Sequence, residues 1–504
     1  MHLYSRNPIM AQTIYGTSVL LILQFVLSSV QLQKASGLPQ IPAIFAFGDS
    51  LIDSGNNNYL TSVAKSNYWP YGCDFSHGPT GRFSNGKTVL DFLGEKVGIP
   101  DLPAFADPRT VGLGILGGVN YASAAAGILD ETGRHWGGRI SLSQQVINFE
   151  STLDGLKRMI GEHNISHYLA RSIAVMSFGS NDYINNYLIP SLYDSSYKYN
   201  PPEFAKFLLN HYTRQLLLWS VFPSYLPLVI QTSSILILLP CQKALYSVGL
   251  RKFFTVGVGP LGCIPNQRAG GQAAPGRCAD YVNQILGSYN EGLRSLVAQL
   301  NANHPAAIFV YVNAYGFLGD ILNNPASFGF KVIDRACCGL GQVTCLPNVT
   351  PCGERNQYVF WDAYHPTEAV NSILAQRAFT GPPSDCYPIN FQHLDSLGAP
   401  NSIRSPERTI AKALDHFHMP LGSFFNNFEG AKLGEWAEAK EPWVGTPVEP
   451  FYFHQCSKEA ELEEANACLF ASQRACNLVR GRLSSKATVL VSYRSYSRSL
   501  SALY

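Results

Sequence analysis

Five short apolar runs recur along the first two thirds of the chain, and most of them end in glycine followed by polar or small residues. The first reads "IPAIFAFGDS", in which uninterrupted apolar residues stop at Gly48, Asp49 and Ser50. Runs this short and this apolar are typical of strands buried on both faces of a sheet. The five predicted strand regions are Ile41–Phe47, Gly117–Leu129, Ser172–Asp182, Lys252–Cys263 and Ala306–Tyr315.

Helical patterns separate these strands. Apolar residues recur at three- and four-residue spacing over Gln144–Lys157 and Tyr281–Asn301, and Pro201–Leu217 begins with proline, as helices often do. Strands that alternate with helices predict right-handed crossovers and a mainly parallel sheet of the α/β class, covered on both faces. Ligands of such sheets bind beyond the carboxyl ends of the strands, where these runs place their polar endings.

The two ends of the chain lack this alternation. Arg6 followed by the apolar run Ser18–Val30 predicts a signal peptide over 1–36, and a membrane anchor is the alternative. We therefore expect one folded domain over 37–390. Residues 391–504 form a C-terminal extension in which charged residues return. It could be a small added domain, a disordered segment or readthrough sequence.

The segment 218–243 interrupts an otherwise regular pattern. Joining Leu217 directly to Ala244 would continue the apolar stripe of the preceding helix to Gly249, where a helix-ending glycine is expected. The segment is rich in Leu, Ile, Val, Phe, Ser and Pro, whose codons are pyrimidine-rich, as in translated intron ends. We predict a retained intron or a gene-model error. Three prolines argue against the alternative of a transmembrane helix.

Composition narrows the class of protein. Of 504 residues, 46% are hydrophobic and 14% charged, with a formal net charge of +2, so the chain is globular and no basic surface for nucleic acid is expected. Six of the twelve cysteines fall within residues 263–352, in a spacing that favours disulfides of undetermined pairing over a metal site. Two sequons, at Asn164 and Asn348, are compatible with glycosylation.

Candidate chemistry lies at the strand ends and late in the chain. Ester hydrolysis by a hydroxyl group requires a nucleophile, a base, a group that orients the base, and donors for the oxyanion. Ser50, Asn181, Asp362 and His365 are the candidates. Each taken singly is more often a turn, a cap or a structural residue.

Four ordered blocks together carry more weight than any single residue. "FGDSLIDSGNNN", "GVNYASAAAGI", "FGSNDY" and "DAYHPTEA" stand in the order and at the separations found in the plant GDSL esterase/lipase family of SGNH hydrolases. The chain resembles that family from about residue 41 to 387, apart from 218–243. The resemblance implies a three-layer α/β/α sandwich with a flavodoxin-like, five-stranded, mainly parallel sheet.

The resemblance also implies a role for each block. Ser50 would be the nucleophile, His365 the general base, and Asp362 the group that orients the imidazole. The oxyanion donors would be the Ser50 amide, the Asn181 side chain and an amide of the second block, for which Gly127 is the best match and Ala125 the rival. No metal and no cofactor are expected.

The predicted function is a secreted serine ester hydrolase of the cell wall, acting as a monomer through an acyl-enzyme on a small-molecule, lipid or polymer ester. The glycine of the first block is expected to let the chain turn sharply, and Asp53 to shape the loop after Ser50. The alternatives are an acyltransferase of the cutin-synthase type and a catalytically inactive surface protein. No nucleic-acid partner and no stable membrane span are expected.

Overall fold

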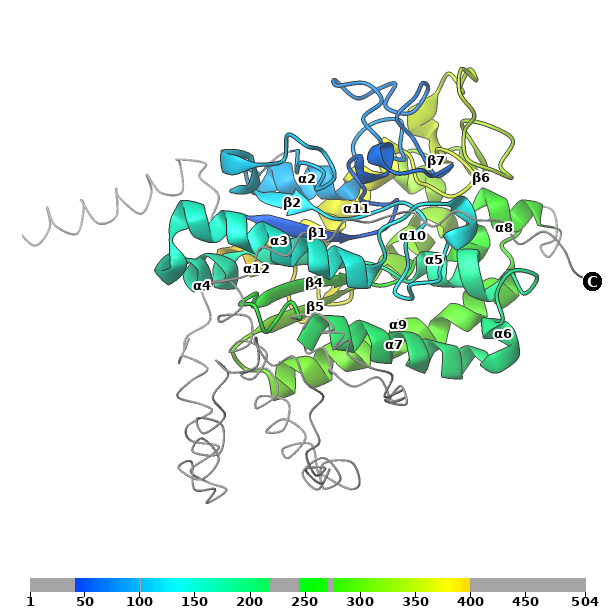
Figure 1. Ribbon diagram of the computed structural model, residues 1–504. Helices are drawn as coiled ribbons and strands as arrows, with labels where there is room; N and C mark the ends of the chain where they lie inside the picture. Colours follow the sequence, from blue (N-terminus) through cyan, green and yellow to red (C-terminus); the bar gives the residue numbers. More distant parts are fainter. Residues whose placement is uncertain (1–40, 100, 218–243, 271–275, 399–504) are drawn as a thin grey trace, which may run out of the picture. The chain divides into compact units, whose positions relative to one another are not determined.

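A six-stranded sheet organises the protein, which we describe from a computed structural model over residues 41–99, 101–217, 244–270 and 276–398. The strand order is β2-β1-β3-β4-β5-β8, and all neighbours are parallel except β5 and β8. The labelled strands β2, β1, β4 and β5 follow one another in this order in Figure 1. The strands are β1 (Ile44–Gly48), β2 (Gly118–Asn120), β3 (Ile173–Ser177), β4 (Lys252–Val256), β5 (Ile308–Val312) and β8 (Cys386–Tyr387).

The five predicted strands are confirmed, and they form the parallel part of this sheet in the predicted class of fold. The antiparallel edge strand β8 was not predicted, because two residues carry no readable pattern. It pairs Tyr387 with Tyr311 and Cys386 with Val312.

Helices cover both faces of the sheet and give three layers. Strand side chains alternate between the faces, so that Phe45 and Phe47 enter one core and Ile44 and Ala46 the other. The first face packs against α3 (Leu142–Ile160), α4 (Glu162–Arg171), α7 (Pro201–Leu217) and α9 (Asp280–Asn303). The second packs against α2 (Val89–Lys96), α10 (Ala314–Asn323), α11 (Glu368–Thr380) and α12 (Phe391–Ser396). This is the expected α/β/α sandwich.

Shorter elements complete the described part of the chain. A second, two-stranded parallel sheet pairs β6 (Val332–Ala336) with β7 (Tyr358–Phe360). The other α- and π-helical segments are α5 (Ser180–Asp182), the π-helical turn Tyr183–Tyr187, α6 (Ser195–Lys198) and α8 (Pro265–Ala269).

The backbone on the two sides of segment 218–243 is hydrogen-bonded as one helix. The Leu245 N–H donates to Gln215 O at 3.2 Å, and the Tyr246 N–H donates to Leu216 O at 2.9 Å. If Leu217 were joined to Ala244, both bonds would run from residue i to residue i−4, as in an α-helix. The segment itself lies outside the described residues, as do the predicted signal peptide and the chain beyond residue 398.

Phe391 and Leu394 of α12 are fully buried in the second core, and the Phe391 ring meets that of Phe254 edge-on at 4.9 Å. The packed chain therefore continues a few residues past the predicted domain boundary at residue 390. Within the described ranges, no helix combines the length and the apolarity needed to cross a membrane.

The six clustered cysteines form three disulfides, as predicted, and the structure supplies the pairing that the sequence left open. The pairs are Cys263–Cys278, Cys337–Cys352 and Cys338–Cys345. The last two tie together the segment between β6 and β7.

Candidate active site

The end of β1 delivers Asp49 and Ser50 to the carboxyl edge of the sheet. Gln145 of α3 holds this end, since its side chain accepts a hydrogen bond from Gly48 N and donates one to Gly48 O, both at 2.8 Å. A Cβ on Gly48 would lie 2.9 Å from Ser177 O and still closer to the Ile52 side chain. Gly48 does not have a positive φ, so the glycine is needed for close packing rather than for the sharp turn expected from sequence.

Ser50, His365 and Asp362 form one hydrogen-bonded chain. His365 Nε2 lies 2.8 Å from Ser50 Oγ, and His365 Nδ1 lies 2.8 and 2.9 Å from the two carboxylate oxygens of Asp362. Asp362 is fully buried, His365 nearly so, and Ser50 is partly buried. The spacing of the three side chains allows a proton to pass from the hydroxyl to the imidazole.

The Asp362 carboxylate is held by several donors. Oδ1 accepts the backbone N–H groups of Tyr364 and His365 at 2.8 Å, and Oδ2 accepts the Tyr71 hydroxyl at 2.6 Å. Burial alone would raise the pKa of Asp362, but the charge of His365 and these hydrogen bonds outweigh it and lower the pKa below its usual value. Asp362 is therefore ionised and fixed in orientation.

The polar loop after Ser50 is hydrogen-bonded to the second sequence block, residues 118–128. Asp53 accepts the N–H groups of Gly55 and Asn56 at 2.7 Å through Oδ1, and that of Ala124 at 3.1 Å through Oδ2. Asn57 binds the same block, since its Oδ1 also accepts Ala124 N at 3.0 Å. These side chains position the backbone of residues 123–127 beside Ser50.

A pocket of about 70 Å³ opens at Ser50. Its wall is mostly apolar, and the Phe83 ring stacks at a tilt against the His365 imidazole, 4.9 Å between ring centres. The polar lining residues are Asp49, Ser50, Ser180, Asn181, Asn185, Thr344 and His365, and the apolar and aromatic ones are Leu51, Ala64, Phe83, Ala124, Ala125, Trp136, Ile184, Leu261, Ile264 and Tyr364.

The second block places Ala125, and not Gly127, on the pocket wall. Ala125 has a φ of 64°, a left-handed conformation uncommon for alanine, and no described acceptor receives its N–H. Gly127 instead faces Asp182 and Thr132, because a Cβ there would lie 2.5 Å from each side chain. Of the two amides considered from sequence, the structure brings Ala125 to the site.

Asn181 lies on the same wall, in the short helix α5 that follows β3. Its Nδ2 donates to Ala126 O at 2.9 Å, and its Oδ1 accepts from Asn185 Nδ2 at 2.6 Å. One of the two N–H bonds of the side chain amide has no acceptor among the described residues. Asn181 therefore meets Ser50 and His365 at one pocket.

Asp49 is a buried carboxyl group beside the triad. Its Oδ1 accepts the Leu51 N–H at 3.0 Å, but its Oδ2 has no hydrogen-bond partner in the described part of the chain. Burial raises the pKa of Asp49 to about 7, against an ordinary value of 3.8. Asp49 thus lacks the donors that keep Asp362 charged.

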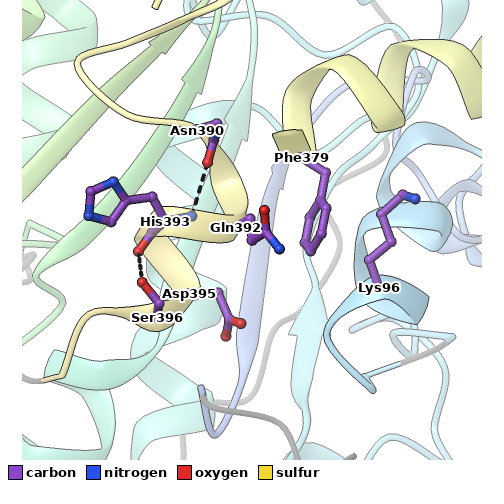
Figure 2. A pocket seen from close by; sticks show the side chains of 7 residues that line it. All are labelled: Lys96, Phe379, Asn390, Gln392, His393, Asp395 and Ser396. Atoms are coloured by element: carbon purple, nitrogen blue, oxygen red, sulfur yellow. Dashed lines mark hydrogen bonds between the residues drawn. The ribbon is translucent and has the colours of Figure 1, made fainter. Parts of the chain in front are cut away.

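A larger hollow, of about 520 Å³, lies away from this site (Figure 2). The α12 side chains of Gln392, His393, Asp395 and Ser396 line it with Asn390, Phe379 of α11 and Lys96 of α2. It adjoins the amino ends of the strands, since Lys252, the first residue of β4, donates to Leu397 O near α12. None of the triad or oxyanion candidates lines it, so we place the chemistry in the smaller pocket.

Sequence analysis did not single out Tyr71, Phe83, Trp136 or Asn185, which line the pocket or hold the residues that do. Each is an ordinary aromatic or amide residue whose role appears only through contacts with distant segments. Within the described ranges, no three His, Cys, Asp or Glu side chains converge as ligands of a metal ion.

A parallel sheet with a Ser–His–Asp chain at its carboxyl edge is the arrangement of hydrolases that react through a serine hydroxyl. Comparison with known proteins specifies the class further. The profile of the GDSL-like Lipase/Acylhydrolase family matches residues 44–378. Three Arabidopsis thaliana proteins illustrate the similarity. GDSL esterase/lipase At1g71250 is 56% identical, in an alignment that covers 75% of this chain and 96% of the relative. GDSL esterase/lipase At5g08460 is 51% identical over 71% of this chain and 88% of the relative, and GDSL esterase/lipase 7 is 41% identical over 72% of this chain and 95% of the relative.

The chain therefore belongs to the GDSL lipase/acylhydrolase family, and it is a carboxylic ester hydrolase.

Proposed function

We propose that Ser50 attacks the ester carbonyl while His365 takes its proton, giving an acyl-enzyme and a free alcohol. The observation that carries this proposal is the unbroken hydrogen-bonded chain from Ser50 Oγ through the imidazole to Asp362. In the attack, the imidazole becomes positively charged, and the buried Asp362 carboxylate lies where it stabilises that charge. His365 then returns the proton to the leaving alkoxide.

The negative charge on the carbonyl oxygen needs donors that are already oriented. We assign this role to the N–H of Ser50, the N–H of Ala125 in place of Gly127, and the free N–H of the Asn181 amide. Support comes from their places on one pocket wall and from the lack of described acceptors for these N–H groups. Each such donor typically contributes about 3 to 4 kcal/mol of transition-state stabilisation.

Water completes the reaction by attacking the acyl-enzyme, with His365 again as base. The mostly apolar pocket wall suits an acyl group and limits competing solvent around the oxyanion.

We propose further that the protein is secreted and acts in the cell wall. Three disulfides support an oxidising compartment, and both sequon asparagines, Asn164 and Asn348, are exposed where a glycan could be attached. The apolar run Ser18–Val30, with Arg6 before it, supports export through a signal peptide.

Steady-state hydrolysis of esters of graded acyl length tests the triad assignment. Ser50→Ala is expected to lower kcat by on the order of 10⁴-fold or more, with an unchanged melting temperature, because the nucleophile is lost but the fold is not. Ser54→Ala, in the same loop, is the matched control. Hydrolysis by Ser50→Ala at the parent rate would refute the assignment, and analysis of products separates free acid from esters formed by transfer to an alcohol.

A further inference from the structure

Asn185 lies one helical turn beyond Asn181, outside the set of groups assigned a chemical role. It sits in the π-helical turn Tyr183–Tyr187, where Leu188 N donates to Tyr183 O at 2.9 Å. Asn185 is buried and has non-helical angles, φ −117° and ψ 18°. Single π-helical turns inside helices often occur at functional sites, since they redirect a side chain.

Two hydrogen bonds fix both ends of the Asn185 amide. The Trp136 indole N–H donates to Asn185 Oδ1 at 3.0 Å, and Asn185 Nδ2 donates to Asn181 Oδ1 at 2.6 Å. An indole nitrogen can only donate, so the atom facing it must be the oxygen of the Asn185 amide. The nitrogen of that amide must then face Asn181.

The same logic determines the orientation of Asn181. Its oxygen faces the Asn185 nitrogen, and its own nitrogen donates to Ala126 O at 2.9 Å. A carbonyl oxygen can only accept. The donor at one end of this row of hydrogen bonds, Trp136, and the acceptor at the other end, Ala126 O, therefore require the same orientation of the two amides between them. No other assignment of the oxygens and nitrogens satisfies both ends.

We propose that Asn185, held by Trp136, is a positioning residue that keeps the N–H side of the Asn181 amide turned toward the oxyanion. With the Asn181 amide reversed, a carbonyl oxygen would occupy that place and would repel the negative charge that develops there. The inference rests on the oxyanion role proposed above for Asn181. It adds a positioning role for the hydrogen bonds Trp136–Asn185 and Asn185–Asn181, which we call the relay. The π-helical turn places Asn185 where it can make both bonds.

A double-mutant cycle tests the relay through kcat on one ester. Asn181→Ala is expected to lower kcat by roughly 10²- to 10³-fold, and Asn185→Ala by roughly 10- to 100-fold, each with little change in KM. Because Asn185 acts through Asn181, adding Asn185→Ala to Asn181→Ala is expected to cause no further loss. A merely structural role would give losses that multiply.

Asn185→Asp supplies a second variant of nearly the same shape. Its carboxylate still accepts from Trp136 but places an oxygen, and no donor, against Asn181 Oδ1. The Asn181 amide then meets an acceptor at each end, this carboxylate or Ala126 O, so its direction is no longer fixed and kcat is expected to fall at least as far as in Asn185→Ala. Asn186→Ala is the matched control. That asparagine is buried in the same turn but bonds to Thr132 and Ser195 instead, at 3.1 and 2.7 Å, so kcat is expected to stay at the parent value.

The outcomes separate this inference from the proposed function. Losses that multiply in the cycle, or a parent-like kcat for folded Asn185→Asp beside an impaired Asn181→Ala, would overturn the relay alone. A parent-like kcat for Asn181→Ala would remove its oxyanion role and the relay with it, and activity in Ser50→Ala would refute the triad.

Discussion

Tyr71 connects the triad carboxylate to a distant disulfide loop. It is fully buried, its hydroxyl donates to Asp362 Oδ2 at 2.6 Å, and it accepts the Cys345 N–H at 3.1 Å. Tyr71→Phe would leave both partners without this hydroxyl, which costs about 1.5 to 3 kcal/mol for a hydrogen bond to a charged group.

We predict that Tyr71→Phe lowers kcat about tenfold, because the carboxylate that orients His365 is less firmly held. Initial rates at saturating ester, with the melting temperature measured in parallel, provide the check. Tyr68→Phe is the control, since the Tyr68 hydroxyl donates to Cys345 O in the same loop without touching Asp362. Equal kcat values for the two variants would contradict the special role of Tyr71.

The buried carboxyl group of Asp49 is expected to make the free energy of unfolding depend on pH. Because burial raises its pKa to about 7, the folded protein retains, between about pH 4 and 7, a proton that the unfolded chain has lost. The free energy of unfolding therefore falls as pH rises through this window.

Asp49→Asn removes the carboxyl group while keeping an acceptor for Leu51 N, so it removes this contribution. The stability of Asp49→Asn relative to the parent is expected to increase with pH by up to about 1.4 kcal/mol per unit between about pH 4 and 7, then to level off. Urea unfolding at several pH values measures it. Burial also raises the pKa of Asp53 and Asp182, to about 6 each, but these groups are present in both proteins. A difference that is constant with pH would contradict the argument.

At the residue level, the sequence identified the site residues that stand in the four ordered blocks, and it did not identify those whose role depends on contacts with distant segments. Ser50, Asp362, His365 and Asn181 were named because they stand in recognisable blocks. The fold brings Ser50, His365 and Asn181 to one pocket and buries Asp362 behind His365. Gly127 was preferred to Ala125 because it is the better match to the second block of the family. The positive φ lies at the alanine, and no pattern in one sequence reveals that. Tyr71 and Asn185 act through partners that only the folded chain brings near.

At the scale of elements, the two sides of segment 218–243 share one helical register. We propose that the segment is an insertion into a helix that would otherwise run from α7 to Gly249. The bonds from Leu245 to Gln215 and from Tyr246 to Leu216 support this, since both become ordinary i to i−4 bonds when the segment is removed.

Deletion of residues 218–243 is expected to yield a folded, active esterase with equal or higher soluble yield and melting temperature. The bonds of Leu245 and Tyr246 to Gln215 and Leu216 already place the two flanks in one helical register, so joining them directly keeps those bonds and removes the cost of closing a loop. Expression of both forms, with melting curves and ester hydrolysis, checks this. An insoluble or inactive deletion variant would contradict it, and transcripts that all retain the segment would exclude the intron explanation.

The same scale shows which elements a pattern can predict. The long helices α3, α7 and α9 have enough residues to display a period, and the five parallel strands lie within short apolar runs that end near glycine, so all were predicted. The strand β8 has two residues and depends on pairing with β5, so its position follows from the completed sheet. The pairing of the disulfides likewise required the spatial neighbours of each cysteine.

At the scale of the whole molecule, a loop closed by a disulfide supports the active site from a distant part of the sequence. Cys338–Cys345 closes the loop whose Thr344 lines the pocket and whose Cys345 N–H binds Tyr71. Replacement of both cysteines by serine is expected to cost about 2 to 3 kcal/mol of stability.

The same Cys338→Ser, Cys345→Ser variant is expected to lower kcat several-fold even well below its melting temperature, because the support of Tyr71 and Asp362 loosens. Activity and unfolding measured side by side test this. In contrast, the removal of Cys263–Cys278 should affect stability more than kcat, because the side-chain hydrogen bonds of Tyr71 in the described part of the chain go to Asp362 and Cys345. A parent-like kcat in the Cys338→Ser, Cys345→Ser variant would show that this disulfide does not support the active site.

The central claim is that Ser50 is acylated during turnover. Reaction with a fluorophosphonate, followed by mass spectrometry of proteolytic peptides, tests it most directly. We predict one adduct per chain, on Ser50, with complete loss of esterase activity, and much slower labelling of His365→Ala. An adduct on another residue, or full activity after Ser50 is modified, would contradict the account.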